Sequence, residues 1–153
     1  MASGPENRFI RSLNSKLPRE VYAEKMHNPY RGGTFDCWYS GRSGDLWVEY
    51  KWIPSIPKTA FVVPELSPLQ KAWGRGRFGE GRKVRVIVGC PDGGVIFNTP
   101  DLWEVGLCAA DFRKAIVTKP AIVAWLVEET TGSNTNDGNS TSSKRSKRKL
   151  VGL

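Results

Sequence analysis

The chain has 153 residues, a formal net charge of +8 and 39% hydrophobic residues, including six Trp, six Phe and four Tyr. This length favours one domain with a sizeable core over two domains. No apolar run approaches a membrane span and the polar N-terminal residues lack a signal-peptide core, so we expect no membrane association.

The cysteines indicate the cellular compartment, and the charge distribution indicates the kind of binding partner. Cys37, Cys90 and Cys108 are widely spaced without a C-x-x-C pair, which disfavours a disulfide framework or a zinc site and favours a cytoplasmic protein. The positive charge favours a polyanionic partner. Residues 133–153 carry five Lys/Arg against Asp137, which leaves +4 on residues 1–132.

Apolar periodicity and turn residues predict a mixed α/β domain over residues 1–132, with a mixed central sheet flanked by helices. In chain order we first expect a helix over Pro5–Leu17 and a strand over Val21–Met26. A hairpin of Phe35–Ser40 and Leu46–Ile53 follows, closed by the four-residue loop Gly41–Gly44, and then a short helix over Ser67–Trp73 with Ser67 as N-cap. The last expected elements are strands over Lys83–Cys90 and Val95–Asn98, joined by the turn Pro91–Gly94, and helices near Pro100–Leu107 and Pro120–Glu129.

The hairpin carries the most specific pattern. If Ser40 faces Asp45, counting outward places Asp36 opposite Glu49 on the same face of the sheet. Directly opposed residues have Cβ atoms roughly 4.5–5.5 Å apart, and two carboxylates that close repel unless a cation lies between them. Mg²⁺ binds one or two carboxylates together with water and phosphate oxygens. The pair therefore predicts a site for Mg²⁺ or Mn²⁺.

Lys51 follows Glu49 by two residues, so strand alternation places its ammonium on the same face. That cation could neutralise charge developing on a phosphate or help to deprotonate a water. Tyr50 points its side chain the other way, but its backbone carbonyl could bind the metal. Asp45 shares the face but lies roughly 13 Å from Glu49 along the strand, too far to share an ion.

An E-x-K pattern alone is a weak motif and is more typical of an ordinary solvent-facing strand. The acid on the neighbouring strand, the aromatic setting and the segment that follows favour a functional site. The run GGTFDCWYSGRSGDLWVEYKW followed by LSPLQKAW resembles the PD-(D/E)XK nucleases, in particular the virus-type replication-repair nuclease domains (VRR-NUC) and related phage Holliday-junction resolvases. The resemblance covers roughly residues 5–98, and the matching positions are Glu6, Gly33 with Asp36, Glu49 with Lys51, and Leu66-Ser67 with Gln70.

The resemblance implies a restriction-endonuclease-like core, with Asp36 and Glu49 as metal ligands, Lys51 as the catalytic lysine, and Glu6 and Gln70 as supporting catalytic groups. Phe35 replaces the Pro usually found before the acid, a residue that shapes backbone rather than chemistry. A solvated glutamate in a first helical turn explains Glu6 equally well.

The resemblance also implies a metal-dependent endonuclease that cuts branched DNA as a homodimer, located in the host cytoplasm if the chain is phage-encoded. Two alternatives stay open. One is a less selective DNA-degrading or nicking nuclease, and the other is a non-catalytic basic DNA-binding protein on a nuclease fold.

Two basic segments are candidates for DNA contacts. The first alternates glycine with positive charge and predicts either a flexible phosphate-binding segment, with Trp73 or Phe78 free to stack on a base, or a plain solvated loop. Its basic residues are Lys71, Arg75, Arg77, Arg82 and Lys83. The second is a cluster in a tail over 133–153 that we expect to be disordered, and it is either a DNA-gripping arm or simply solvated. Its residues are Lys144, Arg145, Lys147, Arg148 and Lys149.

Three further positions bear on the site. His27 is the chain's single histidine, and a structural or surface role is favoured over contact with a phosphate. Trp38 and Trp47 either line the DNA cleft or pack beneath the first helix. Cys37 is expected to face away from Asp36, and without a histidine partner it is a poor nucleophile.

Overall fold

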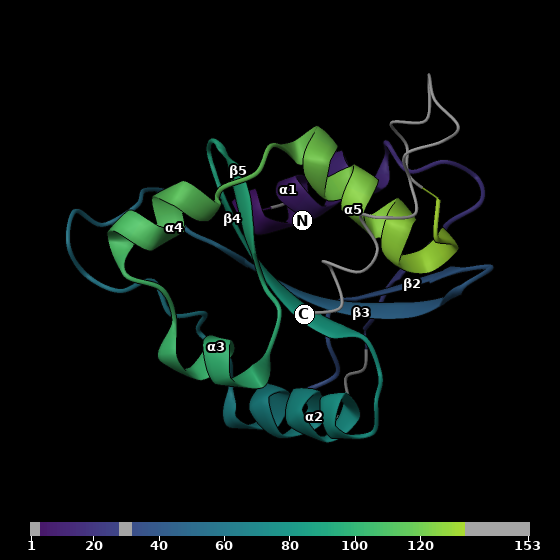
Figure 1. Ribbon diagram of the computed structural model, residues 1–153, viewed down its shortest axis with the longest axis horizontal. Coiled ribbons are helices and arrows are strands. Elements are labelled where there is room, and N and C mark those ends of the chain that lie inside the picture. The colour runs from purple at the N-terminus through teal and green to yellow at the C-terminus, as the bar shows by residue number, and fades with distance from the viewer. Residues whose placement is uncertain (1–3, 28–31, 134–153) are drawn as a thin grey trace, which may run out of the picture.

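The computed structural model of the chain describes residues 4–27 and 32–133. The elements are α1 (Pro5–Asn14), β1 (Tyr22–Lys25), β2 (Cys37–Gly41), β3 (Gly44–Trp52), α2 (Pro68–Gly79), β4 (Val84–Cys90), β5 (Gly93–Phe97), α3 (Pro100–Val105), α4 (Ala109–Ala115) and α5 (Lys119–Thr131). Figure 1 shows α1 and α5 on one side of the sheet, and α2 and α3 on the other.

The described strands form one sheet in the order β1-β2-β3-β4-β5. All neighbours are antiparallel except β3 and β4, which are parallel and are joined through α2. The predicted α/β fold with a mixed sheet and flanking helices is therefore confirmed. Within the described ranges, every helix is too short or too polar to cross a membrane.

Alternation along β3 separates two cores. Leu46, Val48 and Tyr50 are fully buried with α1 and α5. Trp47 is on the opposite face, packed against a second core that includes residues of α2 and α3. Because side chains alternate along a strand, Glu49 and Lys51 share the face of Trp47. The candidate site thus lies on the α2 side of the sheet.

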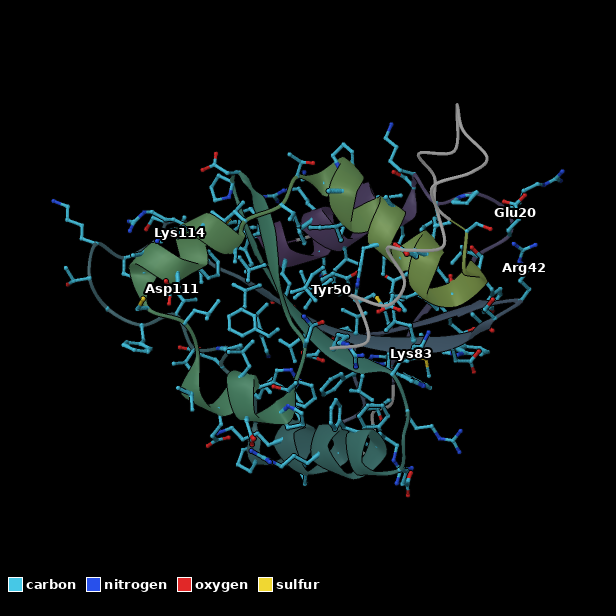
Figure 2. The ribbon with its side chains drawn as sticks, viewed as in Figure 1. Glu20, Arg42, Tyr50, Lys83, Asp111 and Lys114 are labelled. Carbon is cyan, nitrogen blue, oxygen red and sulfur yellow. The ribbon has the colours of Figure 1, made fainter. Side chains whose placement is uncertain are left out.

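The tip of the β2–β3 hairpin is tighter than predicted. Gly41 pairs with Gly44, so only Arg42 and Ser43 lie in the turn, rather than a four-residue loop. The register is unchanged, because both glycines extend the same ladder. Arg42, at the tip in Figure 2, donates from Nε to the Thr131 carbonyl at 3.0 Å, and the Ser43 N–H donates to Thr130 at 2.8 Å. The hairpin tip is thereby fastened to the C-terminal end of α5.

Helix α2 is longer than predicted, and the prediction of a flexible or solvated loop directly after Trp73 is wrong. The helix continues to Gly79, through the glycine-rich basic segment. Packing explains why residue 74 is a glycine: a Cβ at Gly74 would lie 2.7 Å from both Phe35 and Trp103. Glycine lets the helix approach those rings closely, at a cost in helix propensity of about 1 kcal/mol.

The C-terminal half also differs from the sequence expectation in three places. Helix α4 was not predicted, α3 ends at Val105, and α5 extends to Thr131. Each of these helices has a side-chain cap, and Thr99 and Thr118 cap α3 and α5. The predicted basic arm, Lys144–Lys149, lies outside the described residues, and the domain boundary near 132 stays a prediction.

Two glycines of α2 provide a matched test of this packing. A Cβ at Gly76 would meet open space, so Gly76→Ala should stabilise the protein by about 0.5–1 kcal/mol through helix propensity. Gly74→Ala should instead destabilise it by about 1–3 kcal/mol, because Phe35 and Trp103 must move. Urea unfolding measures both changes, and equal stabilisation by the two variants would contradict the packing described.

Candidate active site

The two acids of the hairpin hold each other in place. Cys37 pairs with Val48, and Trp38 with Trp47, so Asp36 lies one step further along, opposite Glu49. The Asp36 N–H donates to Glu49 Oε1 at 3.1 Å, and the Tyr50 N–H donates to Asp36 Oδ2 at 3.1 Å. Each carboxylate is therefore bonded to backbone of the opposite strand, and the register inferred from the sequence is confirmed.

Glu49 is a nearly buried carboxyl, with 2% of its side chain exposed. Its Oε2 accepts a hydrogen bond from Gln70 Nε2 at 3.0 Å and lies 3.4 Å from the Lys51 ammonium. Burial, and after it the adjacent Asp36, raise the pKa of Glu49 to about 8, even though Lys51 opposes both effects. The pair therefore has a strong affinity for positive charge, whether a proton or a metal ion.

Gln70 ties the start of α2 to the acid pair. It is the third residue of a capping box: its N–H donates to Ser67 Oγ at 3.1 Å, and its Oε1 accepts from the Ser67 N–H at 2.9 Å. The same Oε1 lies 3.3 Å from Lys51 Nζ. One amide thus caps the helix and contacts both Glu49 and Lys51, as the sequence motif led us to expect of a supporting group.

Gly33 has a backbone reason to be glycine. Its φ is +100°, and a Cβ there would lie 2.6 Å from the carbonyl oxygen of Leu69, in the first turn of α2. The segment leading to Asp36 therefore passes directly against the helix that carries Gln70. This close approach brings Asp36 and Gln70, which are far apart in the sequence motif, to the same site.

Glu6 is also brought to the site, from the first turn of α1. It is half-buried, and burial and the charge of Asp36 raise its pKa, whereas Lys51 and Lys25 lower it. Glu6 and Lys51 line the same cavity of about 550 Å³. Glu6 is therefore only partly exposed to solvent, and its role in the site stays a prediction.

Most of the remaining cavity lining comes from the segment between β3 and α2, to which we assigned no role from sequence. Its lining includes Pro57, Phe61 and Val63, and Phe61 is 58% exposed. A proline-rich run with exposed apolar residues directly after the E-x-K motif was the available signal. The cavity gives the site an apolar wall beside Lys51.

Tyr50 contributes its backbone rather than its side chain. The side chain is buried on the α1 side, where its hydroxyl lies 2.7 Å from the Tyr39 hydroxyl. The N–H groups of Trp47 and Ile53 point to β4. Along a strand the backbone groups of successive residues point to alternate sides, and Tyr50 is three residues from each of these two. Its N–H and carbonyl therefore point to the β2 side. The N–H reaches Asp36, and the carbonyl points to that same edge.

This donor set fits a hard divalent cation. Asp36 and Glu49 supply two adjacent carboxylates, and Tyr50 supplies a carbonyl oxygen from the same edge. The described part of the chain has no group of three or more His, Cys, Asp or Glu side chains placed to hold a metal. Any ion here would therefore be held by few protein ligands and would leave positions for water and phosphate, as Mg²⁺ prefers.

The predicted DNA-contacting cations of α2 and of the segment after it differ in whether they are already paired. Lys71, Arg75 and Arg77 form ion pairs with Glu104, Asp101 and Glu80, all at surface positions. Lys83, near the start of β4 in Figure 2, is paired with Glu129. Among the described residues, Arg82 has no ion-pair partner. Surface pairs of this kind are weak, so the paired cations can exchange partners.

Several aromatic residues are packed rather than free. Trp73 contacts Phe35 and Trp47 at ring distances of 5.0 and 5.3 Å, and Phe78 contacts Trp103 at 6.5 Å. Trp38 stacks on Trp47 on the α2 side, so the expectation that this pair packs beneath the first helix is wrong.

His27 and Cys37 behave as the sequence indicates. His27 is exposed. Cys37 is buried in the α1-side core, away from Asp36, and burial raises its pKa to about 12. A thiol with that pKa is protonated near neutrality, which removes it as a candidate nucleophile.

Comparison with known proteins gives a likeness in structure alone. No family model and no curated protein matches the sequence. Among solved structures, the chain is similar to Hjc, a Holliday junction resolvase from the archaeal hyperthermophile Archaeoglobus fulgidus, with a TM-score of 0.44 and 18% sequence identity. The likeness covers 69% of this chain and 97% of that chain. It assigns neither a family nor an activity.

The raised pKa of Glu49 predicts how stability depends on pH. Between its ordinary value of 4.5 and about 8, the folded protein binds more protons than the unfolded chain, so stability should fall as the pH rises through that window. The expected loss in metal-free buffer is on the order of a few kcal/mol. Glu49→Gln should flatten this dependence, and Glu128→Gln, at an exposed position on α5, should not. Urea midpoints that fall equally in wild type and Glu49→Gln would contradict the assignment.

Proposed function

We propose that the chain is a metal-dependent DNA endonuclease of the PD-(D/E)XK type, with Asp36, Glu49 and Lys51 at its active centre. One observation carries the proposal: two cross-bonded carboxylates and a lysine share one sheet face, and Gln70 bridges the second acid to the lysine. The order of these residues along the chain matches the motif, and an acid before β2 and E-x-K within β3 match the restriction-endonuclease-like core.

The buried acid favours catalysis over simple DNA binding. Burying a carboxyl beside another costs stability, and DNA binding by basic residues needs no such pair. A non-catalytic DNA-binding protein would gain nothing from Glu49 at this position. This observation favours the enzyme over the decayed-nuclease alternative.

Asp36 and Glu49, with the Tyr50 carbonyl, would hold Mg²⁺ or Mn²⁺. When bound, such an ion polarises the scissile phosphate and lowers the pKa of an attacking water. Lys51 places its ammonium beside the acid pair, where it stabilises negative charge on the phosphate. Gln70 fixes the Glu49 carboxylate through Nε2 and Lys51 through Oε1, so both groups are positioned before DNA binds. Glu6 lines the same cavity as Lys51 and would orient water at the edge of the site.

The substrate we propose is branched DNA, cut by a homodimer in the cytoplasm of the host cell, with a phage gene as the origin. Two symmetric cuts at a four-way junction need two active sites, which a C₂ dimer provides. A domain of this size has little surface for reading base sequence, and this favours recognition of DNA shape. The free thiols of Cys37, Cys90 and Cys108 suit a reducing compartment.

Cleavage of a labelled four-way junction, beside linear duplex of the same sequence, tests the activity. We expect paired cuts with Mg²⁺ or Mn²⁺, none with EDTA, and losses of at least about a hundredfold in Asp36→Asn and Lys51→Ala. Asp111→Asn and Lys114→Ala are matched controls on α4, labelled in Figure 2, and should keep activity because neither residue lines the site cavity. Equal cutting of linear duplex would support the less selective nuclease, and binding without cutting would overturn the enzymatic proposal.

Metal binding can be measured without catalysis. Mn²⁺ or Mg²⁺ at a hundred times its Kd should stabilise the folded protein by about 2.7 kcal/mol, seen as a rise in Tm. Asp36→Asn removes one ligand and should abolish most of that rise, whereas Asp111→Asn should retain it. A metal-induced rise that is the same in Asp36→Asn would place the ion elsewhere.

A further inference from the structure

Among the described residues, part of the sheet face that carries the site lies outside both core clusters. By register, Trp38 lies opposite Glu24 and Trp47, and Ser40 lies opposite Tyr22 and Asp45, so all of these share one face. Tyr22 is 54% exposed, and Glu24 and Asp45 are exposed. This open area, across β1, β2 and the start of β3, adjoins the acid pair.

Trp38 stands out within this area. It belongs to neither of the two core clusters formed by the described residues, although it is one of the largest side chains. Its ring neighbours are Trp47, stacked at 6.1 Å and 23°, and Tyr22, edge-on at 5.4 Å. A partly exposed tryptophan outside the core contributes little to folding and is typical of a contact surface.

Trp47 anchors this pair to the protein. It packs edge-on against Trp73 of α2 at 5.3 Å, and it belongs to the fringe of the α2-side core. Trp38 therefore stacks on a ring that is itself held in place. We call Trp38 and Trp47 the aromatic platform.

The platform is close to the acids along both strands. Trp38 follows Asp36 by two residues and Trp47 precedes Glu49 by two, which corresponds to roughly 7 Å along the strands. A nucleotide adjoining a phosphate held at the acid pair lies within this distance. The platform is thus continuous with the proposed cleavage site.

The charges around the platform distinguish between possible forms of DNA. Trp47 borders a hollow of about 510 Å³ together with Arg82, a cation that forms no ion pair with the described residues. Glu24 and Asp45 flank the rings on the same face, where they accept hydrogen bonds from Tyr22 and Ser40. These acids repel phosphates from the sheet surface, while ring faces attract bases. The arrangement favours a single strand with its bases turned inward over a duplex, which presents phosphates.

We propose that the aromatic platform stacks nucleobases of an unpaired DNA strand directly beside the cleavage site, with Arg82 contacting the phosphates of that strand. The position beside a cut rests on the proposed nuclease function, but stacking itself needs neither metal nor cleavage. The platform would make unpaired nucleotides at a branch point a determinant of where the enzyme cuts.

Binding of labelled single-stranded oligothymidine to the full chain in EDTA, followed by fluorescence anisotropy, tests the proposal. Trp38→Leu keeps an apolar side chain but removes the ring, and it should weaken binding roughly fivefold to a hundredfold. Trp38→Phe keeps a ring and should retain most of the affinity. Trp125→Leu, a half-buried tryptophan of α5 packed against the other core, is the control and should bind normally.

A strand with abasic positions separates base contacts from phosphate contacts. Wild type should bind it more weakly than oligothymidine, and Trp38→Leu should bind the two strands alike. Arg82→Ala should weaken both strands by a similar factor. Melting temperatures of the Trp38 variants should stay within about 4 °C of wild type, because the residue lies outside the core.

Three outcomes would overturn the platform: unchanged binding in Trp38→Leu, equal binding by the Leu and Phe variants, or full wild-type affinity for the abasic strand. A change from dimer to monomer in Trp38→Leu, with unchanged DNA affinity, would assign the surface to a second copy instead. Weakened binding in Trp38→Leu without any junction cleavage by wild type would keep the platform and overturn only the nuclease. Junction cleavage by wild type, together with unchanged binding in Trp38→Leu, would support the nuclease and overturn the platform.

Discussion

The reciprocal hydrogen bonds across the β2–β3 hairpin are the constraint on which the site depends. Asp36 and Glu49 each accept a backbone N–H from the other strand, so neither carboxylate can turn away without leaving an amide unpaired. An unpaired buried amide costs about 1–3 kcal/mol, which offsets part of the repulsion between the two acids. The fold therefore keeps together two groups that would otherwise separate.

Helix α2 completes what the hairpin begins. A capping glutamine normally satisfies only the start of its own helix, but Gln70 also contacts Glu49 and Lys51. The orientation of α2 and the geometry of the site are consequently determined by the same side chain. Gly33 and Gly74 allow this helix to approach the chain before Asp36 and the rings of Phe35 and Trp103.

The sequence was sufficient to predict the hairpin register, because paired strands are constrained by alternation and Gly41 and Gly44 only lengthen the same ladder. It was sufficient for Gln70, because Ser-Pro-x-Gln is a strong helix start. It was misleading after Trp73, because glycines indicate a loop unless the rings that they accommodate are known. The ion pairs of Lys71 and Arg75 with residues of α3 depend on tertiary packing, which local pattern cannot supply. The cavity beside Lys51 was missed for the same reason.

The link between Arg42 and the end of α5 bears on how the protein is made. The two residues joined by the Nε bond, Arg42 and Thr131, are 89 positions apart, so this contact closes a loop spanning most of the described chain. During synthesis the hairpin leaves the ribosome long before its partner exists, and its tip stays unfastened until α5 emerges. The residues of the acid pair thus emerge early and close together in sequence, whereas the tip of the strand pair that carries them is fastened only when α5 docks.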